Sequence, residues 1–147
     1  MDIISPERRS ALMSRIRSKD TGIEVTVRKA LHRLGFRYRL GGARLPGRPD
    51  IVLPKYRVVI FVHGCFWHGH DCPLYRPPKT RRAFWQSKIE SNRERDARNY
   101  AKLHLMAWRV EIIWECQLRK MPEREVKQTI EALAERIQRG IHFVRQR

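Results

Sequence analysis

The residues best suited to chemistry are crowded into one segment, His63-Gly64-Cys65-Phe66-Trp67-His68-Gly69-His70-Asp71-Cys72. It holds three of the six histidines and two of the three cysteines, and the third cysteine, Cys116, lies far along the chain. Three thiolates and one imidazole form a closed tetrahedral set of the kind that holds structural zinc. A lone cysteine is more often a small buried apolar residue, but two in one polar loop beside several histidines favour a metal site. The spacing alone leaves three alternatives for the fourth ligand: His63, His68 and His70.

A second candidate is the dipeptide Pro49-Asp50, which stands at the start of a predicted strand. In metal-dependent nucleases with a restriction-endonuclease-like core, a Pro-Asp at this place is followed on the neighbouring strand by an acid-x-Lys motif. The Asp then carries magnesium and the Lys polarises the attacking water. Here Phe61, Val62 and His63 stand where that motif is expected. Pro-Asp is also common in ordinary turns, so the dipeptide by itself indicates catalysis only weakly.

Glu24 and the pair Phe66-Trp67 each allow two interpretations. Glu24 follows Thr21 at the spacing of a helix capping box, and this structural role is the simpler one. Aromatic residues usually belong to a core, yet Phe66 and Trp67 lie in a loop among residues of metal-ligand types. Exposed aromatic side chains beside a basic surface can also stack on bases or insert between base pairs.

The chain as a whole is strongly basic. Its 147 residues carry 32 Lys and Arg against 15 Asp and Glu, a formal net charge of +17. Of the basic residues 24 are Arg, which favours bidentate contacts with phosphate. Residues 1–49 carry a net charge of +8 and residues 76–109 carry +7, whereas residues 50–75 are neutral. A polyanion gripped by the two basic segments would therefore be presented to the neutral segment between them.

Cysteine content and apolar segments bear on the compartment. An odd number of cysteines argues against a disulfide framework and predicts a reducing, cytoplasmic environment. The first twenty residues lack the apolar stretch of a secretory signal. The longest uncharged stretch, residues 58–70, is too short to span a bilayer, so no membrane association is expected.

Capping residues and apolar periodicity predict four helices, over residues 5–19, 23–34, 83–105 and 122–140, with Gly35 and Gly140 ending the second and the last. Strands are predicted over residues 36–40, 51–53, 57–62 and 108–114, and the uniformly apolar residues 58–62 are typical of a strand covered on both faces. Residues 45–48 suit a type II turn in which Pro49 favours an extended Arg48. This order of elements predicts one α/β domain over residues 1–147, a central mixed sheet flanked by helices.

Three separated motifs together resemble those of the very-short-patch repair endonucleases. They are Leu45-Pro46-Gly47-Arg48-Pro49-Asp50, Val62-His63-Gly64-Cys65-Phe66-Trp67-His68 and Trp114-Glu115-Cys116, and the resemblance runs from about Ser10 to Leu118. These enzymes are bacterial DNA mismatch endonucleases that accompany cytosine-5 methyltransferases. The resemblance implies a restriction-endonuclease-like core with a structural zinc site. This chain has Val62 where the family often has Thr, and Gly69 and Asp71 where it often has His.

The resemblance also implies a role for individual residues. Glu24, Asp50, His63 and His68 would form the catalytic site, with magnesium on Asp50 and on the main-chain carbonyl of Val62. Zinc would be held by Cys65, His70, Cys72 and Cys116. DNA would be contacted by Met13, Arg48, Phe66 and Trp67. Residues 1–20 would form a helix that contacts DNA. Residues 119–147 lie beyond the resemblance, and their apolar periodicity predicts a C-terminal helix and tail.

The implied activity is a magnesium-dependent nick in one strand of duplex DNA, 5′ to the thymine of a T·G mismatch left by deamination of 5-methylcytosine. The expected partners are that DNA, a cytosine-5 methyltransferase and mismatch-repair proteins, and the expected form is a monomer in the cytoplasm, at the bacterial nucleoid. Two alternatives compete with it. A zinc-stabilised DNA-binding protein without nuclease activity would leave Asp50 and His63 without a task. A zinc hydrolase would need an open zinc position, and three thiolates make the metal a poor Lewis acid.

Overall fold

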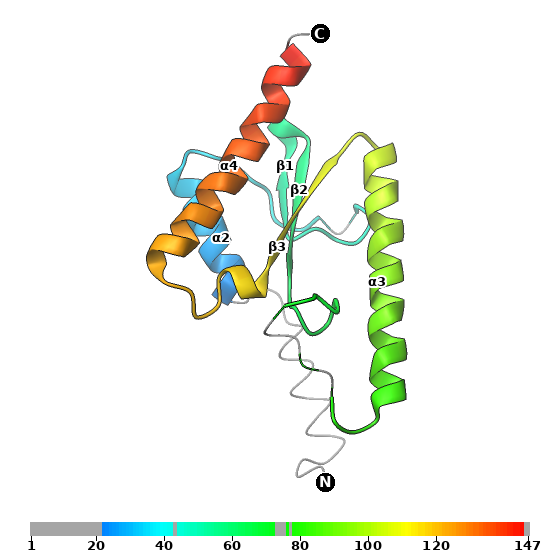
Figure 1. Ribbon diagram of the computed structural model, residues 1–147. Helices are drawn as coiled ribbons and strands as arrows, with labels where there is room; N and C mark the ends of the chain where they lie inside the picture. Colours follow the sequence, from blue (N-terminus) through cyan, green and yellow to red (C-terminus); the bar gives the residue numbers. More distant parts are fainter. Residues whose placement is uncertain (1–21, 43, 73–75, 77, 146–147) are drawn as a thin grey trace.

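A computed structural model describes residues 22–42, 44–72, 76 and 78–145 of the chain (Figure 1). The helix predicted over residues 5–19 lies outside these residues. The described elements, in chain order, are α2 (Gly22–Arg33), β1 (Ile51–Leu53), the 3-10 turn η1 (Pro54–Tyr56), β2 (Val58–His63), α3 (Arg82–Leu105), β3 (Arg109–Trp114), the 3-10 turn η2 (Glu115–Gln117) and α4 (Glu123–Arg145).

The three strands form one mixed sheet in the order β1-β2-β3. β1 pairs with β2 antiparallel, with Ile51 opposite Ile60, and β2 pairs with β3 in parallel, with His63 opposite Trp114. Parallel pairing requires a long crossover, and α3 supplies it between β2 and β3. Because β2 is central, its side chains are buried on both faces, as its uniformly apolar sequence predicts.

Helices cover both faces of the sheet, α2 and α4 on one side and α3 on the other (Figure 1). Alternate strand residues divide between the two faces, since successive side chains of a strand point in opposite directions. Ile51, Leu53, Val58 and Ile60 belong to the cluster that packs on α2 and α4. Val52, Val59 and Phe61 belong to the second cluster, with Leu103 of α3. The predicted α/β architecture with a central mixed sheet flanked by helices is therefore confirmed.

The end of α2 follows its sequence signal. Gly35 has a φ of +93°, and the N–H groups of Gly35 and Phe36 donate to the carbonyls of His32 and Leu31. This pair of bonds is the Schellman motif, which requires a left-handed residue and therefore favours glycine. The next residue, Phe36, is 2% exposed and packs in the core, which anchors the chain where it leaves α2.

Three local predictions are wrong. The strand over residues 36–40 is reduced to one bridge between Arg39 and Val52, because Arg37, Arg39 and Leu40 are exposed at the sheet edge. α4 continues through Gly140 to Arg145, since an interior glycine costs a helix only about 1 kcal/mol. The turn bond from Arg48 N–H to the Leu45 carbonyl forms as predicted, but Arg48 has a φ of +53° and is not extended. Proline disfavours the right-handed helical region for the residue before it, and here the left-handed region is the solution adopted.

Across the described part of the chain, no helix has the length and apolar character needed to cross a membrane.

Candidate active site and metal centre

Asp50 reaches the end of β2 through the antiparallel pairing of β1 and β2. Its N–H donates to the Ile60 carbonyl at 3.0 Å, which continues the ladder one residue before β1. Its side chain then turns back to the same strand, and Asp50 Oδ2 accepts a hydrogen bond from the N–H of Val62 at 2.7 Å. The carboxylate is thereby held beside the last residues of β2, in the position predicted for a metal-binding acid.

Two carboxylates face each other at this point, Asp50 and Glu24 in the first turn of α2. Burial raises the pKa of Asp50 to about 7, the charge of Glu24 and a hydrogen bond with it add to the rise, and the Val62 N–H and His68 oppose it. Two neighbouring, partly buried acids repel each other unless a proton or a cation lies between them. The donor set of the pair therefore fits a hard divalent cation such as magnesium. Thr21, the capping partner predicted for Glu24, lies outside the described residues.

His63 and His68 form a stacked pair at the end of β2. Their ring centroids are 3.6 Å apart with an interplanar angle of 19°. His68 Nδ1 lies 2.5 Å from Oδ2 of Asp96, and His63 Nε2 lies 2.5 Å from the hydroxyl of Tyr100. Both partners belong to α3, so this helix positions both rings.

The two histidines differ in their surroundings. Burial lowers the pKa of His63 to about 3, and the neighbouring His68 lowers it further while Asp96 opposes the change. A carboxylate at Nδ1 of His68 favours a proton on that nitrogen, which leaves Nε2 to accept another. His68 with Asp96 therefore forms a dyad suited to general-base chemistry, whereas His63 is a neutral ring beneath it. His63, His68 and Asp96 are close enough to hold a metal ion, but stacked rings turn faces rather than nitrogens toward each other.

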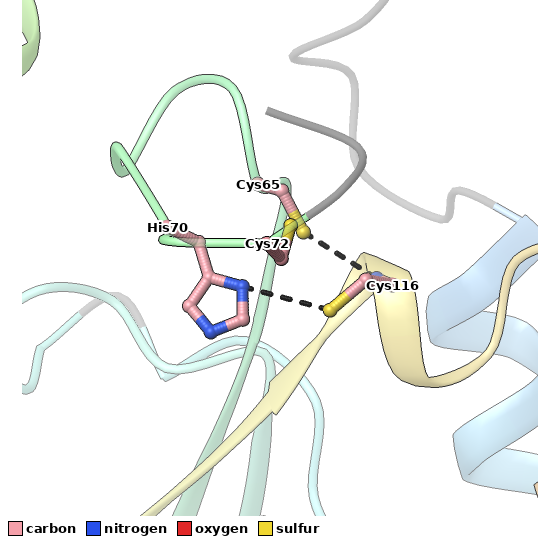
Figure 2. A group of neighbouring side chains, drawn as sticks. All are labelled: Cys65, His70, Cys72 and Cys116. Atoms are coloured by element: carbon pink, nitrogen blue, oxygen red, sulfur yellow. Dashed lines mark hydrogen bonds between the residues drawn. The ribbon is translucent and has the colours of Figure 1, made fainter. Parts of the chain in front are cut away.

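The second cluster unites Cys65, His70, Cys72 and Cys116, whose ligand atoms all lie within 4.8 Å of one another. Figure 2 shows the first three on the loop after β2 and Cys116 on η2, beyond the end of β3. The N–H of Cys116 donates to Cys65 Sγ at 3.4 Å, and Cys116 Sγ lies 3.5 Å from His70 Nδ1. Three thiols and one imidazole converging in this way fit tetrahedral zinc.

The surroundings of the cluster hold its members in place. His70 stacks flat on Trp114, with centroids 3.9 Å apart and an angle of 6°. Burial raises the pKa of Cys65 to about 12 and also raises the pKa of Cys116, so both thiols hold their protons unless a metal binds them. Trp114 also borders His63, with 5.4 Å between ring centroids. It therefore contacts both the histidine pair and the cysteine-histidine cluster.

The loop between the clusters packs closely on α3. Gly69 has a φ of +58°, and a Cβ there would lie 2.6 Å from Ile89 Cγ2 on α3. Asn92 of α3 donates its side-chain N–H to the carbonyl of Trp67 at 3.0 Å. These contacts explain why an aperiodic loop can hold its side chains in a defined place.

Phe66 and Trp67 are half-buried and form an aromatic group with Trp85 of α3. The centroid distances to Trp85 are 5.5 Å for Phe66 and 6.0 Å for Trp67. Neither side chain is fully in the core, so their predicted contact with DNA stays a prediction. Arg48 is exposed two residues before Asp50, and Met13 lies outside the described residues.

Three residues of the site have no role predicted from the sequence: Asp96, Tyr100 and Trp114. Asp96 and Tyr100 lie four residues apart on the same helical stripe as the buried Trp85, Ile89 and Leu103. Polar residues on a buried helical face need partners, and this signal is readable in the sequence. What the sequence does not reveal is that their partners are the two histidines.

Comparison with known proteins adds independent evidence. A family model described as "DNA mismatch endonuclease Vsr" matches residues 1–74. The chain is 50% identical over 126 residues to the type II nicking enzyme V.XorIIP of Xanthomonas oryzae pv. oryzae, covering 86% of this chain and 93% of that protein. It is 47% identical over 140 residues to the DNA mismatch endonuclease Vsr of Escherichia coli, covering 95% and 87%. With the type II nicking enzyme V.NmeAIP of Neisseria meningitidis it shares 48% identity over 118 residues, covering 80% and 84%.

The chain belongs to the Vsr family of DNA mismatch endonucleases. Membership makes it a DNA endonuclease of the repair class, with DNA as its substrate. The Vsr family is restriction-endonuclease-like, in agreement with the mixed sheet and flanking helices. The family resemblance carried by the three sequence motifs is therefore confirmed.

Proposed function

We propose that this chain is a magnesium-dependent endonuclease that nicks one strand of duplex DNA 5′ to the thymine of a T·G mismatch. The observation that carries the proposal is the meeting of Glu24, Asp50 and His68 at the end of β2, with Asp96 on the far nitrogen of His68. Two acids to hold a cation and one oriented imidazole are the parts that metal-assisted phosphodiester hydrolysis needs.

In this proposal Asp50 and the main-chain carbonyl of Val62 would hold magnesium, and Glu24 would belong to the same site. Magnesium, when bound, offsets the charge that develops on the phosphate and on the leaving oxygen. His68 takes the proton of the attacking water at Nε2, because Asp96 holds its Nδ1–H. His63 supports the His68 ring from below through the 3.6 Å stack.

The proposed zinc at Cys65, His70, Cys72 and Cys116 is structural. Three thiolates would leave the ion little Lewis acidity, and four protein donors would leave no open position for a substrate. This ion would tie the loop after β2 to η2 and hold the histidine pair against Trp114.

Mismatch selectivity is assigned to Phe66 and Trp67 from one groove and Met13 from the other, with Arg48 on the phosphates. A T·G pair is less well stacked than its neighbours, so inserting aromatic side chains costs least there. One relative is named a mismatch endonuclease and others are named nicking enzymes, which supports cleavage of one strand.

We place this activity in repair of deaminated 5-methylcytosine, by a monomer at the nucleoid that works with a cytosine-5 methyltransferase and mismatch-repair proteins. The proposed enzyme is one domain over residues 1–147, with residues 1–20 on the DNA and residues 119–147 as C-terminal helix and tail.

A nicking assay tests the proposal. Duplexes that differ only in one pair, T·G, T·A or C·G, carry a different label on each strand and are incubated with and without magnesium. We expect a single nick 5′ to the mismatched thymine, on the T·G duplex and with magnesium only. Tight binding without cleavage in any metal would instead favour the zinc-stabilised DNA-binding protein.

A further inference from the structure

Each histidine of the pair is held by a different polar residue of α3. Asp96 binds His68, and Tyr100, one helical turn later, places its hydroxyl 2.5 Å from Nε2 of His63. A spacing of four residues puts both side chains on one helical face. Tyr100 is half-buried, and its ring packs edge-on against Phe61 at 5.3 Å and 60°. Packing against Phe61 therefore holds the Tyr100 ring so that its hydroxyl lies beside His63.

The hydrogen bond with Tyr100 satisfies a polar atom of the buried His63 ring. His63 is 6% exposed, and a buried ring nitrogen is costly without a hydrogen bond. Among the described residues, no buried side-chain nitrogen or oxygen lacks a partner, and Tyr100 is the partner of Nε2. Whichever of the two groups donates the hydrogen, Nε2 is engaged and the plane of the His63 ring is defined.

That plane matters because His68 rests on it. The ring centroids of His63 and His68 are 3.6 Å apart, and the rings lie within 19° of parallel. The Trp114 ring also borders His63, with a centroid distance of 5.4 Å. A rotated His63 ring would no longer support His68 in this orientation. Asp96 defines His68 at one nitrogen only, so a second support is needed to keep the imidazole from tilting.

We propose that Tyr100 is a positioning residue for the nicking reaction, whose hydroxyl orients His63 and, through the stack, His68. Tyr100 carries no proton to or from the substrate in this role. The proposal rests on the proposed function, because that function assigns the proton transfer to His68.

The test compares Tyr100→Phe with Tyr56→Phe in the full-length, zinc-containing protein. Tyr56 is the matched control, because it is a half-buried tyrosine that packs on Phe36 at the opposite face of the sheet. Three readouts are measured: imidazole ¹⁵N shifts of labelled histidine in the free protein, the single-turnover nicking rate on a T·G duplex, and the half-saturating protein concentration.

We expect Tyr100→Phe to shift the His63 and His68 signals but not those of His70. The nicking rate should fall about three- to tenfold, the effect of one neutral hydrogen bond, at unchanged half-saturation. The melting temperature should fall by only a few degrees, because buried Nε2 of His63 loses its partner while the fold is kept. Tyr56→Phe should leave all of these as in the parent protein. Unmoved His63 and His68 signals, or a nicking rate equal to that of Tyr56→Phe, would overturn the proposal. If the parent protein does not nick T·G DNA, the proposed function fails, and the imidazole spectra of the free protein still decide whether Tyr100 orients the pair.

Discussion

The catalytic assignment depends at the residue scale on one oriented imidazole. Asp96 lies 2.5 Å from Nδ1 of His68 and thereby selects which nitrogen of His68 faces the reaction. Replacing the carboxylate by an amide keeps the size of the side chain but removes its preference for an N–H partner. The wrong tautomer of His68 then becomes accessible.

Asp96→Asn should therefore lower the single-turnover nicking rate at least about hundredfold, within the range that general acid–base catalysis contributes. DNA affinity should change little. Glu94→Gln, the same change on the exposed face of α3, is the control and should nick at the parent rate. A normal rate for Asp96→Asn would show that His68 does not act as the base.

A second residue-scale consequence concerns stability and pH. The folded pKa of Asp50, about 7, lies above its ordinary value of 3.8, so burial favours the protonated acid in the folded protein. The stability that this preference contributes is complete below about pH 4 and is lost as the pH rises through 7.

Asp50→Asn mimics the protonated acid and should stabilise the protein, with magnesium absent, at pH 8 but not at pH 4. We expect the free energy of unfolding at pH 8 to rise by about 1 kcal/mol, which corresponds to about 2–4 °C in the melting temperature of a chain of this size. Thermal unfolding at both pH values, with the exposed Glu131→Gln as control, measures the effect. Equal melting temperatures for the variant and the parent at pH 8 would contradict a destabilising carboxylate.

At the scale of elements, the sequence predicts what local signals determine. The apolar run of β2, the Gly35 stop of α2 and the spacing on α3 each depend on neighbours along the chain, and each prediction agrees with the structure. The strand predicted over residues 36–40 is wrong, because pairing at an exposed sheet edge depends on distant residues. The extended conformation predicted for Arg48 and the helix end predicted at Gly140 are wrong, because a local preference of about 1 kcal/mol is easily outweighed.

The candidate site divides in the same way. Asp50, His63 and Cys116 were recognisable by residue type and motif, whereas the meeting of Glu24 with Asp50 depends on how α2 packs beside the sheet. The partners of the histidines, Asp96 and Tyr100, come from a crossover helix that begins about twenty residues later. Their helical spacing shows that both residues need partners, but tertiary packing decides that the partners are the histidines.

The zinc cluster offers a prediction about elements, because it joins the loop after β2 to η2. Cys116→Ser should release zinc and lower the melting temperature by several degrees, since metal binding and folding are coupled. Chelation of zinc from the parent protein serves as the control and should lower the melting temperature to a similar extent. A variant that keeps one zinc per chain and the parent melting temperature would show that Cys116 is not a ligand.

At the scale of the whole molecule, two basic segments flank a neutral one that carries Asp50, His63, His68 and the pair Phe66-Trp67. Residues 1–49 and 76–109 have net charges of +8 and +7, whereas residues 50–75 are neutral. Non-specific affinity should therefore come from the flanks and fall steeply with salt, while selectivity comes from the site between them.

Trp67→Ala separates these contributions. It should lower cleavage of T·G duplexes by about tenfold, since one base–aromatic contact is worth about 1–3 kcal/mol. Non-specific binding and its salt dependence should not change, and the melting temperature should fall only slightly, because Trp67 is half-buried beside Trp85. A collapse in the melting temperature would show that Trp67 acts through packing instead.

The assignment of Asp50 is tested most directly by measuring binding and cleavage of one T·G duplex in the same samples, by fluorescence anisotropy and by strand analysis. The parent protein and Asp50→Asn are compared with and without magnesium. We expect the parent protein to nick the thymine strand once, and only with magnesium. We expect Asp50→Asn to bind the duplex within about threefold of the parent and not to nick it, because the variant loses a metal ligand and a charge that repels phosphate. Nicking by Asp50→Asn at the parent rate, or loss of binding together with cleavage, would contradict the assignment of Asp50 as the magnesium ligand of the active site.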